Sequence, residues 1–279
     1  MKARRKVIGV LIFILFLLVA FIMLFPVYYL LVGSFQDGQE IFRSGMKVFL
    51  NPESIKWTNY PNLFTYKDGL YVKWFTNSVL YAAVFTLCGL VLSSLVGYGL
   101  GAYDFRGKNV IFVMVLVVMM IPLEILMLPL YQLIVKIRLI NTVGGIVFPF
   151  MVSPVAIFFF RQFVSGMSRE YMEAARIDGC TEFGIYYRIA VPLMKPAFGA
   201  MTILLAMQNW NSFVWPLIVL RENEKFTLPI GIASLINPYS ANYDVMIAGS
   251  VVAILPILIL FLFNQRFFIA GLTSGGVKG

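Results

Sequence analysis

Six long stretches of the chain carry little or no charge, and shorter charged segments separate them. Val7 to Gln36 and Trp74 to Tyr103 carry no charged side chain, and Asn109 to Val135 carries only Glu124. Three further uncharged stretches occupy residues 139–160, 196–220 and 245–265. About 20 residues of helix cross a hydrocarbon core of roughly 30 Å. Each stretch is therefore long enough to span a membrane.

Helix is the expected structure of these stretches, because a backbone inside lipid must satisfy its hydrogen bonds within its own segment. The sequence thus predicts an all-α polytopic membrane protein, a single transmembrane domain over residues 1–279. Its six transmembrane helices are expected at residues 7–35, 74–102, 109–135, 139–160, 196–220 and 245–265. Prolines inside them permit kinks. Gly97 and Gly101 form a small-xxx-small pair that predicts close helix packing.

Composition supports this interpretation and excludes several chemistries. Hydrophobic residues make up 60% of the chain and charged residues 13%, with a mean hydropathy of +0.87, whereas soluble domains carry about 25% charge. The absence of histidine excludes histidine triads and histidine metal sites. Cys88 and Cys180 have no spacing typical of a disulfide framework or a metal cluster. No catalytic and no metal-binding residues are predicted.

Basic residues set the expected orientation. Lys2, Arg4, Arg5 and Lys6 precede the first uncharged stretch, which favours a cytoplasmic N-terminus. That stretch is too long for a signal peptide and no small-residue cleavage site follows it. Six spans then return the C-terminus to the cytoplasm, with the loop at 161–195 on the same side. The net charge of +9 is attributed to contact with anionic lipid headgroups rather than nucleic acid.

The loop between the fourth and fifth spans contains a predicted helix. Residues 168–196 read SREYMEAARIDGCTEFGIYYRIAVPLMKP. Ser168 is a candidate N-cap, Glu173 and Arg176 are spaced to pair along the helix, and Gly179 is a candidate helix end. Pro192 stops the apolar pattern that follows.

One face of this helix is apolar. Met172, Ala175, Gly179 and Phe183 recur at helical spacing. Such a helix either lies on the lipid surface or docks into a groove of a partner protein. The residue pattern alone leaves both possibilities open.

The same loop resembles the EAA loop of permease subunits of ABC importers. The matching positions are Glu173, Ala174 and Ala175, then Gly179, Ile189 and Val191-Pro192; the family commonly has Leu where Val191 stands. The resemblance implies that the helix around Glu173 to Gly179 is a coupling helix. In this family that helix sits in a cleft of the ATP-binding subunit and transmits closure of the ATPase dimer. The residues expected in this coupling are Glu173, Ala174, Ala175, Arg176, Asp178, Gly179, Ile189 and Pro192.

Further matches resemble the carbohydrate branch of these importers. They are IPLE at 121–124 with PLY at 129–131, NWNSFVWPL at 209–217, and the ending GLTSGGVKG at 271–279. The ending resembles the maltose-type second permease, whose tail reaches between the ATPase subunits. The resemblance therefore implies docking by the C-terminal tail 271–279, through Thr273, Ser274, Gly275 and Gly276; a disordered end is the alternative.

Candidate residues for a substrate path carry two interpretations each. Glu124 is the only acid inside an expected span; it either lines a wet path or bonds backbone freed by Pro122 and Pro129. Asn209, Trp210 and Asn211 offer an aromatic plate and amide groups suited to a sugar. Tryptophan at a helix end also marks membrane interfaces.

The resemblance implies import by ATP-driven alternating access in a bacterial or archaeal cytoplasmic (inner) membrane. The implied partners are two ATP-binding cassette subunits, a second similar permease and an extracytoplasmic sugar-binding protein. No GxxxxGK[ST] motif occurs, so no cofactor is expected in this chain, and ATP and Mg²⁺ belong to the partners. An importer for a non-sugar solute remains an alternative. A secondary transporter would need a paired repeat and more intramembrane ionisable groups, and a channel would need a filter or charge rings.

Overall fold

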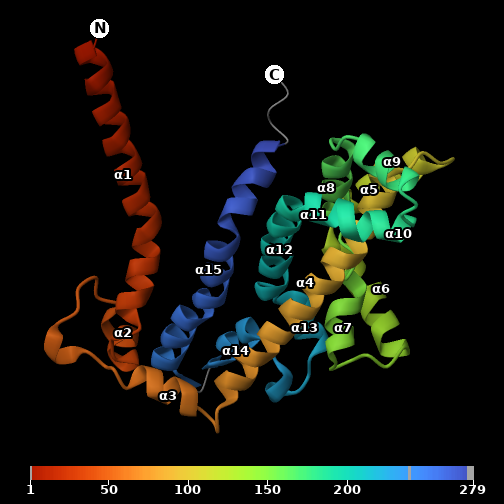
Figure 1. Cartoon of the computed structure of the whole chain (residues 1–279). Coiled ribbons are helices and arrows are strands. Elements are labelled where there is room, and N and C mark those ends of the chain that lie inside the picture. Colours follow the sequence, from red (N-terminus) through yellow and green to blue (C-terminus); the bar gives the residue numbers. More distant parts are fainter. Residues whose placement is uncertain (1, 238–239, 275–279) are drawn as a thin grey trace. The chain divides into compact units, whose positions relative to one another are not determined.

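The computed structural model is almost entirely helical, as the sequence predicts, and Figure 1 shows its helices in chain order. It describes the backbone of residues 2–237 and 240–274 and the side chains of residues 6–236 and 242–266. Contacts divide the chain into two compact units. Unit 1 comprises residues 1–72 and 231–255, and unit 2 comprises residues 73–230 and 256–279.

Unit 1 begins with the long helix α1 (Lys2–Gly33). The short helices α2 (Gly38–Ser44), η1 (Pro52–Ser54) and α3 (Asn59–Thr65) follow. The unit also holds the two-residue strands β1 (Ile236–Asn237) and β2 (Ser240–Ala241), which pair antiparallel, and the start of α15 (Tyr243–Ser274). The loop after α1 is held by the buried amide of Asn59, which donates to the carbonyls of Ser34 and Gln36 at 2.9 Å each.

Unit 2 is built around α4 (Leu70–Ala102), whose first residues belong to unit 1. The other elements are α5 (Lys108–Met120), α6 (Leu123–Lys136), α7 (Val143–Val147), η2 (Phe148–Phe150), α8 (Pro154–Ser165), α9 (Glu170–Ile177), α10 (Glu182–Ile185), the π-helical turn η3 (Tyr186–Ala190), α11 (Val191–Leu193), α12 (Lys195–Trp210), α13 (Val214–Val219), η4 (Asn223–Lys225) and α14 (Leu228–Ser234), which continues into unit 1. The end of α15 completes the unit.

Close packing of α4 on α8 depends on the glycine pair that the sequence singles out. A Cβ at Gly97 would lie 2.6 Å from the Cβ of Phe160, and one at Gly101 would lie 2.7 Å from the Cβ of Val164. Real Cβ atoms do not approach that closely, so only glycine permits this distance between the two helices. The predicted small-xxx-small packing is confirmed.

Three single helices among the described residues are long and apolar enough to cross a membrane, and three bent pairs could each form one further span. The single helices are Lys6–Gly33, Leu70–Ala102 and Tyr243–Arg266. The pairs bend by 100° between α5 and α6, by 48° between Val143–Phe150 and α8, and by 77° between Glu182–Leu193 and α12. Six spans are therefore compatible with the structure.

The expected continuous helix at 109–135 is wrong, because the chain breaks at Ile121 and Pro122. Both residues have extended backbone, with ψ of 118° and 130°. Proline disfavours helical backbone in the residue before it, and it lacks the N–H that would continue the helix. The expected span at 139–160 is likewise divided, and Ser153 caps α8 by accepting from the N–H of Ala156.

Candidate functional site: the loop between α8 and α12

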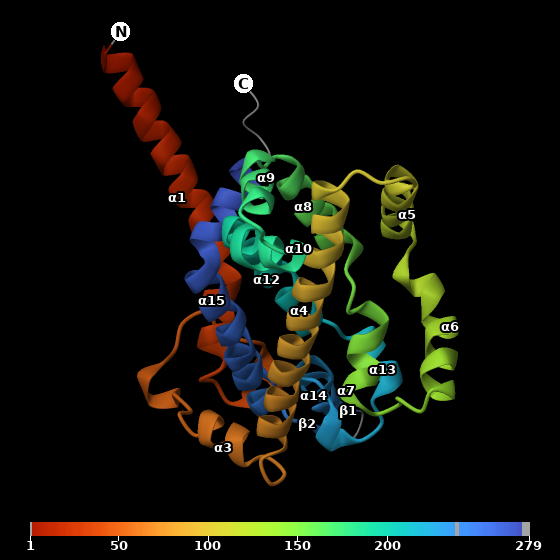
Figure 2. The same ribbon diagram turned by 45° about the vertical axis from the view of Figure 1, so that its right-hand side comes forward.

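The loop between α8 and α12 folds as two short helices, α9 and α10, which lie beside the end of α4 (Figure 2). Ser168 accepts a hydrogen bond from the N–H of Glu170 at 3.3 Å, just before α9. Glu170 and Glu173 lie in the first turn of α9 and Arg176 in its last turn. This order of charges complements the helix dipole.

Gly179 ends α9, as predicted. Its φ is +77°, a conformation that costs an L-residue with a side chain about 1–2 kcal/mol. The N–H of Cys180 donates to the carbonyl of Ala175 at 2.9 Å, and the N–H of Gly179 donates to that of Arg176 at 3.0 Å. This pair of bonds is a Schellman motif, which ends the helix. The chain turns here and continues into α10. The Thr181 hydroxyl then caps α10 by accepting from the N–H of Gly184 at 3.1 Å.

Two of the four residues of the predicted apolar face pack inside this chain itself. Met172 and Ala175 are 4% and 5% exposed and belong to a core cluster with residues of α4, α8 and α12. Met172 and Ala175 are covered by their own chain, so the helix would meet lipid or a partner through other side chains.

The outward surface of the loop includes the other two residues of the predicted apolar face, Gly179 and Phe183. Glu173, Ala174, Asp178 and Gly179 are exposed. The large apolar or aromatic side chains exposed in the loop are Tyr171 (60%), Ile177 (87%), Phe183 (80%), Tyr187 (73%) and Leu193 (42%). Sequence reasoning missed Tyr171, Ile177 and Tyr187, since the apolar period along the loop identifies the buried face rather than the exposed one.

Two other motif residues lie after α10. Ile189 is half-buried and packs against the core cluster, so it anchors the loop. Pro192 is exposed in the short helix α11. Because its nitrogen carries no hydrogen, the regular helical ladder is interrupted here, directly after the π-helical turn η3.

Arg176 pairs with Glu182 rather than with Glu173, so that predicted pairing is wrong. Its Nε and Nη2 donate to the two carboxylate oxygens of Glu182 at 2.7 and 3.2 Å. The hydroxyl of Tyr103 donates to the same carboxylate at 2.5 Å. The guanidinium, as the main cause, and the phenol lower the pKa of Glu182, and the hydrogen bond to Glu182 raises the pKa of Arg176. Among the described residues, Glu173 has no ion pair.

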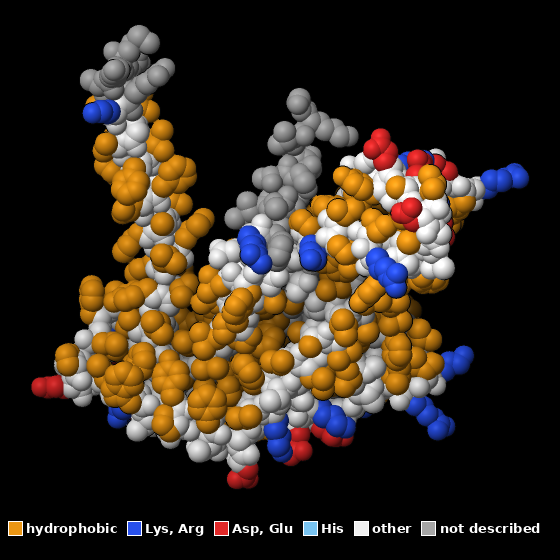
Figure 3. All heavy atoms as spheres, in the orientation of Figure 1, with side chains coloured by type: hydrophobic (Ala, Val, Ile, Leu, Met, Phe, Trp, Pro, Cys, Tyr) orange, Lys and Arg blue, Asp and Glu red, His pale blue; other side chains and the backbone are white. Residues whose placement is uncertain are grey.

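A second ionic group lies beside this one. Oδ1 of Asp104 lies 3.0 Å from Nζ of Lys108. Oδ2 of Asp104 lies 3.0 Å from Nη1 of Arg169, the residue before α9. Its hydrogen bonds to Lys108 and to Arg169 hold the pKa of Asp104 below its usual range. Figure 3 shows charged side chains gathered at the α9 and α10 end of unit 2, and hydrophobic ones over the helices next to it.

The candidate substrate-path residues near residue 210 differ in exposure. Trp210 is 6% exposed and meets Phe75 edge to face, with ring centroids 5.9 Å apart. It lines an apolar cavity of about 330 Å³ between α4, α12 and the end of α15. Asn209 is half-buried and Asn211 exposed. The predicted aromatic plate is therefore covered, which favours packing over sugar contact for Trp210.

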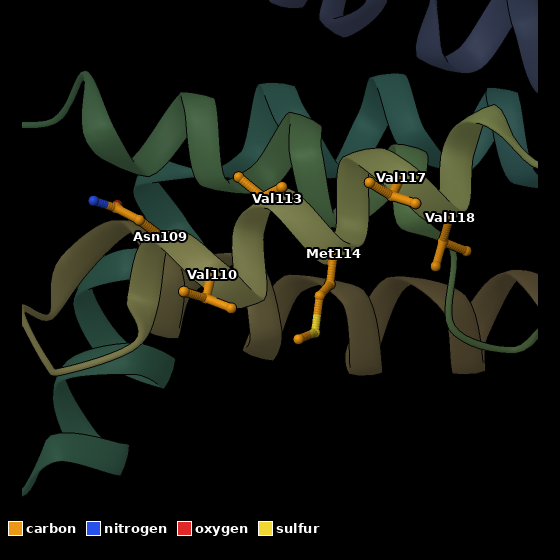
Figure 4. A pocket seen from close by; sticks show the side chains of 6 residues that line it. All are labelled: Asn109, Val110, Val113, Met114, Val117 and Val118. Atoms are coloured by element: carbon orange, nitrogen blue, oxygen red, sulfur yellow. The ribbon is translucent and has the colours of Figure 1, made fainter.

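Glu124 is exposed in the first turn of α6. Among the described residues its carboxylate has no ion pair and no hydrogen bond, so the backbone freed by Pro122 and Pro129 is not its partner. A groove of about 570 Å³ runs along α5, formed by the side chains shown in Figure 4. Five of these six residues are Val or Met, and Asn109 is the sixth. A sugar needs more hydrogen-bonding groups than this groove offers.

Thr273 and Ser274 form the end of α15, which extends beyond residue 265, the expected end of the sixth span. Their side chains lie outside the described residues, as do Gly275 and Gly276 entirely. The described residues contain no group of acids and cysteines that could hold a metal ion.

Residues 89–269 match the family model of the binding-protein-dependent transport system inner membrane component. The chain belongs to this family. It is therefore a membrane permease component of a binding-protein-dependent importer and is not itself an enzyme.

Two relatives support the assignment, and a solved structure shares the fold. The chain is 53% identical over 264 residues to the arabinooligosaccharides transport system permease protein AraQ of Bacillus subtilis, covering 95% of this chain and 94% of that protein. It is 33% identical to the lactose transport system permease protein LacG of Rhizobium radiobacter, covering 99% and 98%. Its fold matches a chain of a bacterial ABC transporter involved in the import of the acidic polysaccharide alginate, with a TM-score of 0.82 at 23% identity, covering 94% and 97%.

Proposed function

We propose that this permease imports an oligosaccharide by alternating access, and that partner subunits supply the energy by hydrolysing ATP. Support for the sugar comes from two relatives whose names specify arabinooligosaccharides and lactose. The 53% identity over nearly the whole chain favours an arabinose oligosaccharide over lactose. The matches at 121–124 and 209–217 to the carbohydrate branch point to the same class of substrate.

The ATP-binding subunit is proposed to contact the permease at α9. The observation that carries this proposal is the outward surface of the loop, where Tyr171, Ile177 and Phe183 are exposed, as is Glu173. Large apolar side chains that are exposed to water outside the membrane are unfavourable unless a partner covers them. The resemblance of the spacing from Glu173 to Pro192 to the EAA loop supports the ATPase as that partner.

The complete importer is proposed to hold two ATP-binding cassette subunits, this chain, a second similar permease and an extracytoplasmic sugar-binding protein. ATP and Mg²⁺ are bound by the cassette subunits, and this chain holds no cofactor. The basic cluster at residues 2–6 supports an N-terminus in the cytoplasm. With six spans, the C-terminus and the α9 loop face the same compartment. The tail at 271–279 is proposed to dock on the cassette subunits.

Glu124 is proposed to face the translocation path. Its carboxylate is exposed in an apolar segment, and a charge there requires water or a polar partner. Asn209 and Asn211 are proposed as further polar groups of the path, although Trp210 beside them is covered by Phe75.

Reconstitution of the complete importer tests the function. The complex is placed in liposomes, and its binding protein is added on the side of the membrane where the solute is supplied. ATP hydrolysis and uptake are then measured with arabinose oligosaccharides and, separately, with glycerol phosphate. Stimulation by the oligosaccharides alone is expected. Stimulation by glycerol phosphate alone would contradict the sugar assignment.

The α9 contact is tested by Glu173→Lys in the same complex. Charge reversal on the exposed surface is expected to release the ATPase subunits and abolish uptake, while the permease still inserts in the membrane. Glu53→Lys is the matched control, because Glu53 is exposed in the other unit. Retention of the ATPase by the Glu173→Lys complex would contradict the contact.

A further inference from the structure

Two consecutive residues after α4 hold both ends of α9. At the start of α9, the Asp104 carboxylate binds Arg169 at 3.0 Å. At the end of α9, Tyr103 donates to Glu182 at 2.5 Å, and Glu182 accepts both bonds from Arg176. We call these five residues the α4–α9 clamp. The clamp joins elements 65 to 79 residues apart in sequence.

A layer of aromatic rings lies beneath the clamp. Tyr98 is 4% exposed, and its hydroxyl contacts the sulfur of Met172 in α9 at 3.7 Å. Its ring meets those of Tyr103 and Tyr186, with centroids 5.6 and 5.2 Å away. Tyr186 in turn shares a hydrogen bond of 2.7 Å with Ser94 of α4. The buried face of α9 therefore rests on rings carried by the last turns of α4 and by η3.

Without lateral contacts, α9 would be poorly suited to move another helix. Gly166 precedes it and Gly179 follows it, and residues at the ends of elements are where hinge motions are absorbed. A displacement of α9 would then be taken up by these turns. Contacts at both ends of α9 oppose this, because they tie α9 to the residues that directly follow α4.

The chemistry of the clamp is suited to fixing geometry rather than to adding stability. Arg176 and Glu182 form a two-bond guanidinium–carboxylate pair, which restricts orientation as well as distance. Their side chains are 39% and 50% exposed, and those of Arg169 and Asp104 are 62% and 68% exposed. Isolated pairs this exposed contribute little to folding. Loss of the clamp should therefore affect transmission of movement more than folding.

We propose that the α4–α9 clamp is a positioning device that transmits the displacement of α9 to α4. Span two is then the first transmembrane element to move when the ATPase subunits close. This proposal rests on the proposed contact between α9 and the ATPase. Its distinguishing consequence is that loss of the clamp separates ATP hydrolysis from uptake without detaching the ATPase.

The test uses the complete reconstituted importer with its binding protein and an arabinose oligosaccharide. Tyr103→Phe removes one hydrogen bond and keeps the ring, and Glu182→Gln removes the charge at the centre of the clamp. Uptake per ATP hydrolysed is expected to fall about 5-fold or more, in the usual range of coupling between sites. The amount of bound ATPase and the thermal unfolding midpoint are expected to stay near those of the unchanged protein.

The control is Lys73→Gln, which removes an exposed ion pair with Glu224 near the other end of α4. It is expected to leave uptake per ATP unchanged. The double variant Arg176→Glu with Glu182→Arg reverses the pair, and the Tyr103 hydroxyl can accept a bond from an arginine as well as donate one to a carboxylate. This exchange is expected to restore most of the coupling lost in Glu182→Gln.

The outcomes separate the clamp from the ATPase contact. Unchanged uptake per ATP in both Tyr103→Phe and Glu182→Gln would overturn the clamp proposal. A fall in uptake per ATP that occurs only together with a lower thermal unfolding midpoint would overturn it as well. If Glu173→Lys fails to release the ATPase, the contact itself is wrong and the clamp falls with it. Release by Glu173→Lys together with uncoupling by the clamp variants supports both.

Discussion

Arg176 shows how the choice of partner depends on the fold around a residue. Its sequence position permits a bond to Glu173 along the helix, but the structure gives it Glu182, six residues later. The Schellman turn at Gly179 brings α10 back alongside α9, and Glu182 then offers two oxygens at once. Glu173 keeps its carboxylate on the exposed surface, where a partner can bind it.

Gly179→Ala tests the importance of this turn. A Cβ at residue 179 would have no atom within 4 Å, so the substitution adds no steric clash. Its only cost is the positive φ of +77°, which is unfavourable for alanine. We expect a local cost of about 1–2 kcal/mol, a displaced α10 and a reduced rate of uptake by the reconstituted complex. Gly99→Ala is the control, because Gly99 has equally open surroundings but lies inside α4, near its C-terminal end, without a positive φ. Equal uptake by the two variants would show that the turn geometry does not matter.

At the scale of elements, the contact of α4 with α8 depends on two glycines one turn apart. Two clamp residues, Tyr103 and Asp104, directly follow α4, and the α9 loop begins after α8. The separation of α4 and α8 therefore sets where the loop lies with respect to the membrane-spanning part of unit 2.

Gly101→Val should separate α4 from α8. The new Cβ would lie 2.7 Å from the Cβ and Cγ1 of Val164, and overpacking of this kind costs about 1–3 kcal/mol. We expect a lower thermal unfolding midpoint in detergent, measured by the fluorescence of a thiol-reactive dye. Gly99→Val, with nothing within 4 Å, is expected to unfold near the original temperature. A midpoint of Gly101→Val as high as that of Gly99→Val would contradict the packing argument.

At the scale of the whole molecule, the chain is one component of a larger importer. The family match covers residues 89–269, and the relatives align over nearly the full length of the chain. Helix α1 is consistent with a role in a larger assembly, because none of its most apolar segment is buried within the described structure. A helix with so apolar a surface requires lipid or another membrane protein around it.

Deletion of residues 271–279 tests the proposed docking of the tail. We expect the permease to insert in the membrane and to bind the ATPase, with less ATP hydrolysis in response to sugar and binding protein. The measurement is the ratio of stimulated to basal ATP hydrolysis in the reconstituted complex. A ratio equal to that of the full-length complex would show that the tail has no role in docking.

The membrane class, the number of spans and the family all follow from the sequence. An uncharged stretch of about 20 residues or more is long enough to cross a membrane and is expected to do so as a helix. The spacing from Glu173 to Pro192 is read directly from the sequence and does not depend on how the chain packs. The end of α9 at Gly179 was also predictable, because glycine alone adopts positive φ without cost.

Only the tertiary structure decided which surfaces are covered. It placed Met172, Ala175 and Trp210 inside and left Ile177 and Phe183 outside. An apolar period shows that a helix has a buried side, but what buries it is set by residues distant in sequence. For the same reason the bond from Tyr103 to Glu182 could not be predicted, since it depends on how α4 and α10 are brought together across 79 residues of chain.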